Sequence, residues 1–477
     1  MKTRTRFAPS PTGYVHIGNI RSALFPYLLA KQNKGTFILR IEDTDQNRFV
    51  ADAEAIILDT LRWLGLQWDE GVEVGGPFGP YRQTERRDHY IKWAEKLIKK
   101  GLAYADPYTP EEVQKFRQAA EKAKKPFLYR NHRPENPPKW ELGMPLRFKQ
   151  TKIERKYWHD EIMGDLEAGA ETLDDFILIK ADGLPTYNFA HIVDDAEMEC
   201  THVTRGIEYI SSMANYLALY EALGLKPPIF VHMPHVMAPS GNKKLGKRDG
   251  AKSVQEYRAE GYLPEAMLNF LVMLGWNDGT TTDIFSLDDM VKQFDLTRVQ
   301  RAGARFDEKR LLWLNGQWIR RTDIAKLFNY AKDFWGENGQ KATDERKLEV
   351  LAGVQERLKT LGDLPTLTEY FFTTPKIDLS MITDNKFLSR FSKDELITML
   401  EVATLKLKTT EWQTDSLQEA LNQLLTETAR KPAELFSLLR IAVSYAPFSP
   451  ELPRTFAVLG QAESIARLQA TMDALHA

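Results

Sequence analysis

The sequence predicts an α/β protein whose amino-terminal part is built on a parallel sheet and whose carboxyl-terminal part is helical. Short apolar runs alternate with helical patterns through residues 1–100, which is the rhythm of a parallel sheet with crossover helices. After about residue 251, helical patterns continue nearly to the end of the chain. With 477 residues, of which 43% are hydrophobic, the chain is long enough for about three domains.

The elements of the first hundred residues can be placed in order. We expect strands over residues 4–8 and 36–41, and helices over residues 20–31, 51–64 and 87–100. The first of these helices repeats its apolar residues at helical spacing, which predicts one buried face. The last ends on lysines followed by glycine, the usual sign of a helix C-terminus.

From about residue 107 the character of the chain changes. A charged helix is expected over residues 111–125, then the proline-rich stretch RPENPPKW, then strands near 146–148 and 176–180. We interpret this segment as an insertion into the first domain. The parallel-sheet pattern resumes beyond it, and the helical region follows, with elements expected at 199–204, 211–223, 230–232, 417–428 and 433–444.

Charge and cysteine content exclude several classes of protein. Sixty-four Lys and Arg against sixty-six Asp and Glu leave a net charge of -2, so any contact with a polyanion must be local. Cys200 is the only cysteine, which rules out an internal disulfide or a multi-thiolate zinc site. The N-terminus lacks an apolar signal-peptide core, and apolar windows such as residues 266–276 are too short to span a bilayer. We therefore expect a cytoplasmic protein without a membrane partner.

Residues 6–19 run from a strand through a turn rich in Pro and Gly into a helix. Such a junction presents free backbone N–H groups to an anion. His16 can donate an imidazole N–H to a phosphate, and Gly18 lets a ligand lie against the backbone. By itself the short match around His16 and Gly18 is weak, and a surface loop with a histidine that caps the helix is the preferred interpretation.

A second candidate is the basic run at residues 243–248, which follows Pro239-Ser240-Gly241. Residues 241–247 also satisfy the phosphate-loop pattern G-x-x-x-x-G-K, but that pattern needs a hydroxyl at the next position and Arg248 has none. The alternative is a solvated turn.

A third candidate is the acidic cluster at residues 40–45, at the end of a predicted strand. Ligands of open parallel sheets bind at the carboxyl ends of strands, so this cluster and His16 can face the same crevice. The alternative is a turn whose acids cap a helix.

Seven segments, in this order and spacing, resemble the glutamyl-tRNA synthetases of bacterial type, which are class I aminoacyl-tRNA synthetases: FAPSPTGYVHIGN, LRIEDTD, GPYRQTER, DGLPTYNFAHIVDD, KKLGKRDGA, EGYLPEAMLNFLVMLGW and LLWLNGQWIR. The resemblance is dense over about residues 2–320. The remainder is similar in length and helical character to the anticodon-binding region of that family.

The resemblance implies a Rossmann-type catalytic domain with an inserted α+β acceptor-binding domain, followed by an all-helical anticodon-binding region. The expected boundaries are 1–105 and 191–250 for the two halves of the catalytic domain, 106–190 for the insertion, 251–320 for a helical stem-contact domain, and 321–477 for the anticodon-binding region. It also implies an ATP-dependent, AMP-forming ligase that activates L-glutamate and transfers it to the 3′ end of tRNA(Glu).

The same resemblance implies which residues form the binding site. It places ATP against Thr12, His16, Gly18, Glu208 and Lys247, and makes His16, Lys244, Lys247 and Arg248 the catalytic groups. It places glutamate against Arg6, Ala8, Ser10, Glu42, Tyr187, Asn188 and Arg205. Arginine suits a carboxylate because its planar fork makes two parallel hydrogen bonds. Which arginine takes the side-chain carboxylate does not follow from the residues, although the family favours Arg6.

The implied partners are L-glutamate, ATP with Mg²⁺, and tRNA, and we expect a monomer. Lysines and arginines of the insertion are candidates for the acceptor end of the tRNA. Arg357 is the candidate for the anticodon, because splayed RNA bases are recognised by arginine and aromatic side chains.

The sequence departs from the family pattern in four places. Gly246 replaces the usual serine of the basic loop, Asp249 a frequent histidine, and Ile207 an acidic residue. The segment from Tyr104 to Tyr108 lacks the cysteines that hold zinc in some relatives, so we expect no zinc. These departures keep a second interpretation open, namely a paralogue with altered preference for the glutamine tRNA, or a regulatory protein that binds tRNA or adenylate with weak turnover.

Overall fold

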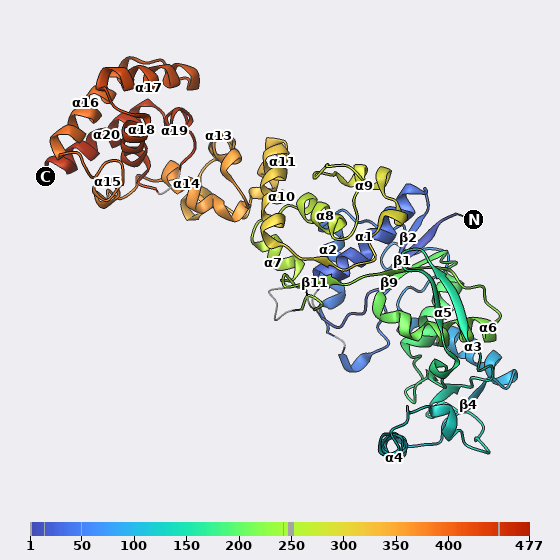
Figure 1. Ribbon diagram of the computed structural model, residues 1–477. Coiled ribbons are helices and arrows are strands. Elements are labelled where there is room, and N and C mark those ends of the chain that lie inside the picture. Colours follow the sequence, from blue (N-terminus) through green and yellow to red (C-terminus); the bar gives the residue numbers. More distant parts are fainter. Residues whose placement is uncertain (1, 14, 49, 242, 247–251, 447–448) are drawn as a thin grey trace. The chain divides into compact units, whose positions relative to one another are not determined.

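The computed structural model describes the whole chain except residues 1, 14, 49, 242, 247–251 and 447–448. It divides into two compact units (Figure 1). Unit 1 contains residues 1–256 and 267–307, and unit 2 contains residues 257–266 and 308–477. None of the helices among the described residues has both the length and the apolar character needed to cross a bilayer.

Parallel strands form the centre of unit 1. β1 (Arg4–Phe7) pairs with β2 (Thr36–Leu39), which pairs with β3 (Glu70–Gly71). A second set runs β9 (His202–Gly206), β10 (Ile229–Met233) and β6 (Lys156–Asp160), all parallel, with β7 (Gly164–Ala168) antiparallel at its edge. The N–H of Thr201 donates to the carbonyl of Arg4 at 2.9 Å, so the first strands of the two sets lie side by side.

Helices that each bury at least one face flank these strands. They are α1 (Ile17–Gln32), α2 (Ala53–Trp63), α3 (Arg87–Lys99), α5 (Tyr187–Glu197) and α6 (Met213–Leu223). Buried aromatic and aliphatic side chains of α3, α5 and α6, among them Tyr90, Phe189 and Tyr216, pack in one cluster with side chains of β6, β9 and β10. Burying such side chains contributes about 1.5–3 kcal/mol each, which holds the helices against the sheet.

A small antiparallel sheet begins just before the segment interpreted as an insertion and continues within it. Its strands are β4 (Ala103–Ala105), β5 (Leu146–Phe148) and β8 (Ile177–Ile179), and α4 (Pro110–Lys122) lies in the loop between the first two. Thr109 caps α4 by accepting a hydrogen bond from the N–H of Glu112. The insertion also holds β6 and β7, of which β6 pairs with β10 and β7 pairs with β6.

Unit 1 continues into a region of short elements. β11 (Val236–Met237) pairs in parallel with β12 (Ala304–Arg305). α9 (Leu287–Gln293) belongs to unit 1, whereas α7 (Val254–Ala259) and α8 (Pro264–Met273) are each divided between the two units, because residues 257–266 belong to unit 2.

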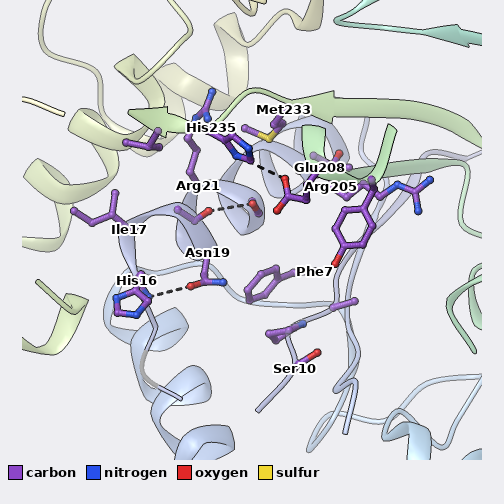
Figure 2. Close-up of a pocket in the computed structure, with 18 of the residues that line it drawn as sticks. Phe7, Ser10, His16, Ile17, Asn19, Arg21, Arg205, Glu208, Met233 and His235 are labelled. Carbon is purple, nitrogen blue, oxygen red and sulfur yellow. Dashed lines mark hydrogen bonds and ion pairs between the residues drawn. The ribbon is translucent and has the colours of Figure 1, made fainter. Parts of the chain in front are cut away.

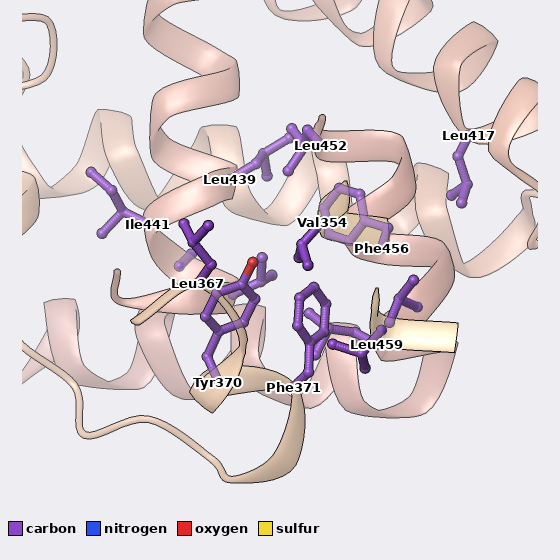
Figure 3. Packing of buried hydrophobic residues seen from close by; sticks show 14 of the residues in the cluster. Val354, Leu367, Tyr370, Phe371, Leu417, Leu439, Ile441, Leu452, Phe456 and Leu459 are labelled. Carbon is purple, nitrogen blue, oxygen red and sulfur yellow. The ribbon is translucent and has the colours of Figure 1, made fainter. Parts of the chain in front are cut away.

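The described residues of unit 2 contain helices and no strand. The helices are α10 (Glu308–Arg321), α11 (Ile324–Ala331), α12 (Glu337–Lys341), α13 (Asp344–Val354), α14 (Leu364–Phe372), α15 (Ser380–Thr383), α16 (Lys393–Thr409), α17 (Thr414–Thr428), α18 (Pro432–Ser444), α19 (Leu452–Leu459) and α20 (Gln461–His476). One continuous apolar core joins them, in which Val354, Leu439 and Phe456 are buried (Figure 3). The predicted fold class, an α/β part followed by a helical part, is confirmed.

Candidate active site

A cavity of about 520 Å³ lies at the carboxyl ends of the parallel strands of unit 1 (Figure 2). Phe7 at the end of β1, Gly206 at the end of β9 and Met233 at the end of β10 line it. This is where open parallel sheets bind ligands. The predicted site residues that line the same cavity are Arg6, Ala8, Ser10, Thr12, His16, Gly18, Glu42, Tyr187, Arg205, Glu208 and Lys244.

The start of α1 forms one wall of the cavity. His16 is the N-cap residue, and its backbone N–H donates to the Asn19 side-chain oxygen at 3.1 Å. The first turn of α1 carries no acidic residue, so nothing there opposes an anion at the positive end of the helix. A Cβ added at Gly18 would meet no atom within 4 Å. Protein packing therefore does not explain this glycine, whereas the approach of a ligand to the helix start would.

A chain of buried charges runs along the floor of the site. Arg6 donates to both oxygens of Asp195, at 3.0 and 3.3 Å, and to the carbonyl of Thr204 at 2.9 Å. Arg40 joins Asp195 at 2.8 Å to Glu42 at 2.9 Å. Burial favours the neutral form of Asp195, but Arg6 and Arg40 hold its pKa below the ordinary value. The Arg6 guanidinium is thus already paired with a carboxylate of the protein.

Burial raises the pKa of Glu42 above its ordinary value, although Arg40 and Arg6 act in the opposite direction. A further cation beside a buried carboxylate with a raised pKa stabilises its ionised form. Glu42 lines the cavity, so the ammonium group of an amino acid is a suitable partner.

Arg205 has different partners. Its Nε donates to Nε2 of His232 at 3.1 Å and one terminal nitrogen lies 3.2 Å from Nε2 of His191. The ring of Tyr187 stacks on His191 with 4.8 Å between ring centroids. Tyr187 and Arg205 therefore both contact His191. The predicted neighbour Asn188 does not line the cavity, and its side-chain oxygen accepts a hydrogen bond from the Tyr216 hydroxyl at 2.8 Å.

The described part of the basic run also reaches the cavity. Lys244 forms a β-bridge with Met237, and its ammonium lies 3.4 Å from Glu208. The other carboxylate oxygen of Glu208 lies 3.7 Å from His235 (Figure 2). Beyond the run, Ser253 forms a β-bridge with His16. Lys247, Arg248 and Asp249 lie outside the described residues.

Arg21 is a cavity residue that the sequence analysis missed. It is 2% exposed, lines the cavity and donates to the carbonyl of Pro234 at 2.6 Å. Burial lowers its pKa to about 10. The available signal was a cation next to Ile20 on the apolar face of the predicted helix, where a solvated side chain is not expected.

Arg357 belongs to unit 2 and lines a second cavity, of about 490 Å³. It lies at the end of the short 3-10 helix Gln355–Arg357. The other lining residues are Lys359, Asp363, Thr366, Leu367, Arg440 and Ser449. Burial, and then the charge of Arg357, lower the pKa of Arg440. Two arginines at one cavity make an environment suited to an electron-rich polar ligand.

Known proteins resemble the chain over its whole length. Residues 2–313 match the catalytic domain of the class I tRNA synthetases (E and Q). Glutamate–tRNA ligases from Clostridium botulinum and Clostridium acetobutylicum are both 40% identical to it, over 100% and 99% of this chain and 99% and 98% of theirs. The chain belongs to the glutamate–tRNA ligase family. The family's catalytic region therefore coincides with the part of the chain that holds the larger cavity.

Solved structures of the family have the same fold. A glutamate tRNA ligase from Elizabethkingia meningosepticum, crystallised with its amino acid, superposes with a TM-score of 0.87 at 34% identity and covers all of both chains. Residues 326–472 match an anticodon-binding domain, which lies within unit 2. The predicted family and the predicted enzyme, a glutamate–tRNA ligase, are confirmed by these similarities. Class I tRNA synthetases use ATP. The role of each cavity residue stays a prediction.

Proposed function

We propose that this protein activates L-glutamate with ATP and transfers the glutamyl group to the 3′ end of tRNA(Glu). One observation supports this above the others. Most of the residues predicted for ATP, for glutamate or for catalysis, drawn from segments as distant as Arg6 and Lys244, line one cavity.

In the first step the α-carboxylate of glutamate attacks the α-phosphorus of ATP, forming glutamyl-adenylate and releasing pyrophosphate. The nucleophile is already ionised, so no general base is required. Catalysis then depends on alignment and on neutralising the charge that develops on the phosphate oxygens. His16, Lys244, Lys247 and Arg248 are suited to that task because each can donate to an anionic oxygen.

The nucleotide side of the cavity fits a triphosphate. The start of α1 supplies backbone N–H groups, and the open space at Gly18 leaves room for the nucleotide. Thr12 and Glu208 line the same side in this proposal. Mg²⁺ prefers phosphate oxygens and water, so ATP would bring it with few protein ligands, and the exposed Glu208 is an acid within reach.

The amino-acid side offers a cation for each carboxylate and an anion for the ammonium. Arg205 and Arg6 serve the carboxylates and Glu42 the ammonium, while Tyr187, Ser10 and Ala8 shape the wall. Glutamine would present an amide NH₂ to an arginine that needs an acceptor, which opposes its binding by about 1–3 kcal/mol. In this proposal Asn188 does not contact glutamate. Its side-chain oxygen accepts a hydrogen bond from Tyr216, whose ring lies against Arg205.

Aminoacylation of separated glutamate and glutamine tRNAs tests the proposal. Purified protein with ATP, Mg²⁺ and labelled glutamate should charge the glutamate tRNA. Charging of the glutamine tRNA alone would favour the paralogue with altered preference, to which Gly246, Asp249 and Ile207 point. Absence of any glutamyl-tRNA would contradict the proposed function.

A further inference from the structure

Arg205 is a buried arginine that no protein carboxylate neutralises among the described residues. It is 5% exposed, and its fork contacts His232, His191 and the sulfur of Met213. Among the other buried arginines of unit 1, Arg6 pairs with Asp195 and Arg86 with Asp194, whereas Arg21 donates to the carbonyl of Pro234. A buried charge without a counter-ion costs several kcal/mol, so this arrangement calls for a reason.

The partners of Arg205 establish the state of both histidines. A guanidinium has only donors, so the Nε2 atoms of His191 and His232 must be unprotonated acceptors. Nδ1 of His191 lies 2.8 Å from the carbonyl of Tyr187, which can only accept. Nδ1 of His232 lies 2.6 Å from Asp160, which is buried. Each imidazole therefore carries one proton, on Nδ1, and is neutral.

The surroundings keep these histidines neutral. Burial and then the charge of Arg205 lower the pKa of His191 to about 3. Burial also lowers the pKa of His232, against the pull of Asp160. Asp160 contacts the imidazole of His232, and this imidazole lies between the carboxylate and Arg205. The hydrogen bonds therefore hold the Arg205 guanidinium in place without neutralising its positive charge.

Aromatic rings complete the support. The guanidinium carbon lies 4.8 Å from the ring centroid of Tyr216, 5.5 Å from that of Tyr209 and 5.7 Å from that of Phe230. Aromatic faces stabilise a desolvated cation by about 1–2 kcal/mol without bringing a negative charge. Arg205 lines the cavity, so an anion in the cavity can reach it.

We propose that His191 and the His232–Asp160 pair are positioning residues, which orient Arg205 through neutral acceptors so that its charge remains available to a carboxylate of the bound amino acid. This inference rests on the proposed function and deepens it. It makes Arg205, rather than the already paired Arg6, the main source of affinity for an anionic amino acid.

Substitutions that differ only in charge test the inference. His191→Gln places an amide oxygen near the position of Nε2, and His191→Glu places a carboxylate there. If Arg205 requires an uncharged hydrogen-bond acceptor at this position, the Gln variant should bind glutamate within about threefold of the wild type. The Glu variant should then bind glutamate at least about tenfold more weakly than the wild type. The KM for ATP should change less than about twofold in both, because Arg205 does not serve the nucleotide.

A second matched pair covers the case in which the Glu variant does not fold. Met213→Gln and Met213→Glu make the same comparison at the third contact of Arg205. Thermal unfolding identifies which variants are folded. Equal glutamate affinity of the Gln and Glu variants at both positions would overturn the inference.

Calorimetric titration with glutamate, beside the charging assay, separates this inference from the proposed function. A wild-type protein that binds glutamate without charging tRNA would contradict the proposed function, and the affinities of the variants would still decide the role of the histidines. A wild-type protein that binds no glutamate would contradict both.

Discussion

At the scale of single residues, the site is distinguished by how each buried charge is balanced. Arg6 and Arg205 lie at the ends of β1 and β9 and are almost equally buried. Arg6 has a carboxylate partner in Asp195, and Arg205 has two neutral imidazoles. The two arginines are therefore not equivalent, although the same residue type stands at both strand ends.

The neutral state of His191 makes the stability of unit 1 depend on pH. Its pKa is about 3 in the folded protein and about 6.5 in an unfolded chain, so the unfolded chain takes up the proton first as the pH falls. The stabilisation is complete above about pH 6.5 and decreases by about 1.4 kcal/mol per pH unit below it. Urea unfolding at pH 7 and 5 should show a smaller loss for His191→Gln than for the wild type. Equal losses would contradict this assignment.

Lys247 is the cation of the basic run on which activation is expected to depend most. Lys247→Ala should slow adenylate formation by about ten- to a thousandfold, about 1.4 to 4 kcal/mol, because one donor to the phosphates is lost. Pyrophosphate exchange in the presence of tRNA measures the rate, with the exposed Lys226→Ala as the control. A large fall in melting temperature with an unchanged rate would contradict the role.

At the scale of elements, α1 combines a structural and a binding function. Most of its residues from Ile20 to Ala30 are buried, whereas a Cβ added at Gly18, at its start, would meet no atom within 4 Å. The helix thus anchors the sheet with one part and presents its amino end to the cavity with another.

Gly18→Ala separates these two functions. The change should stabilise the protein by up to about 0.5–1 kcal/mol, because alanine favours a helix, while raising the KM for ATP about tenfold or more. Gly316→Ala in α10 is the matched control, since its added methyl would make ordinary contacts and its helix belongs to unit 2. If Gly18→Ala left the KM for ATP unchanged, ATP would not lie against the start of α1.

At the scale of the whole molecule, the two cavities belong to different units. Unit 1 holds the cavity lined by the predicted ATP and glutamate residues, and unit 2 holds the cavity lined by Arg357. With a net charge of -2, the protein offers tRNA no overall attraction, so local arginines must supply it.

Substitution of Arg357 should therefore affect only the tRNA. Arg357→Gln should raise the KM for tRNA(Glu) about tenfold, on the order of one lost base contact of 1–3 kcal/mol, and leave the KM for glutamate and ATP unchanged. Arg454→Gln, at an exposed position of α19, is the control for loss of one positive charge in unit 2. An equal effect of both variants would reduce the role of Arg357 to general electrostatics.

Local patterns predicted most elements because helix and strand periodicity is a property of neighbouring residues. The strand expected at 146–148 is β5, and the helix expected at 433–444 begins one residue earlier as α18. The hairpin of β6 and β7 was missed, because each strand has only five residues within a charged segment and β7 contains no buried residue. The five predicted domain boundaries stay predictions.

The sequence by itself determined the family, the order of the elements and the residue types available to the site, because ordered motifs and periodic patterns are read along the chain. The tertiary structure alone decided which charges remain unpaired. Asp195 reaches Arg6 across 189 positions of sequence and His232 reaches Arg205 across 27. The availability of a buried cation depends on the groups that folding brings to it, and no local pattern contains that information.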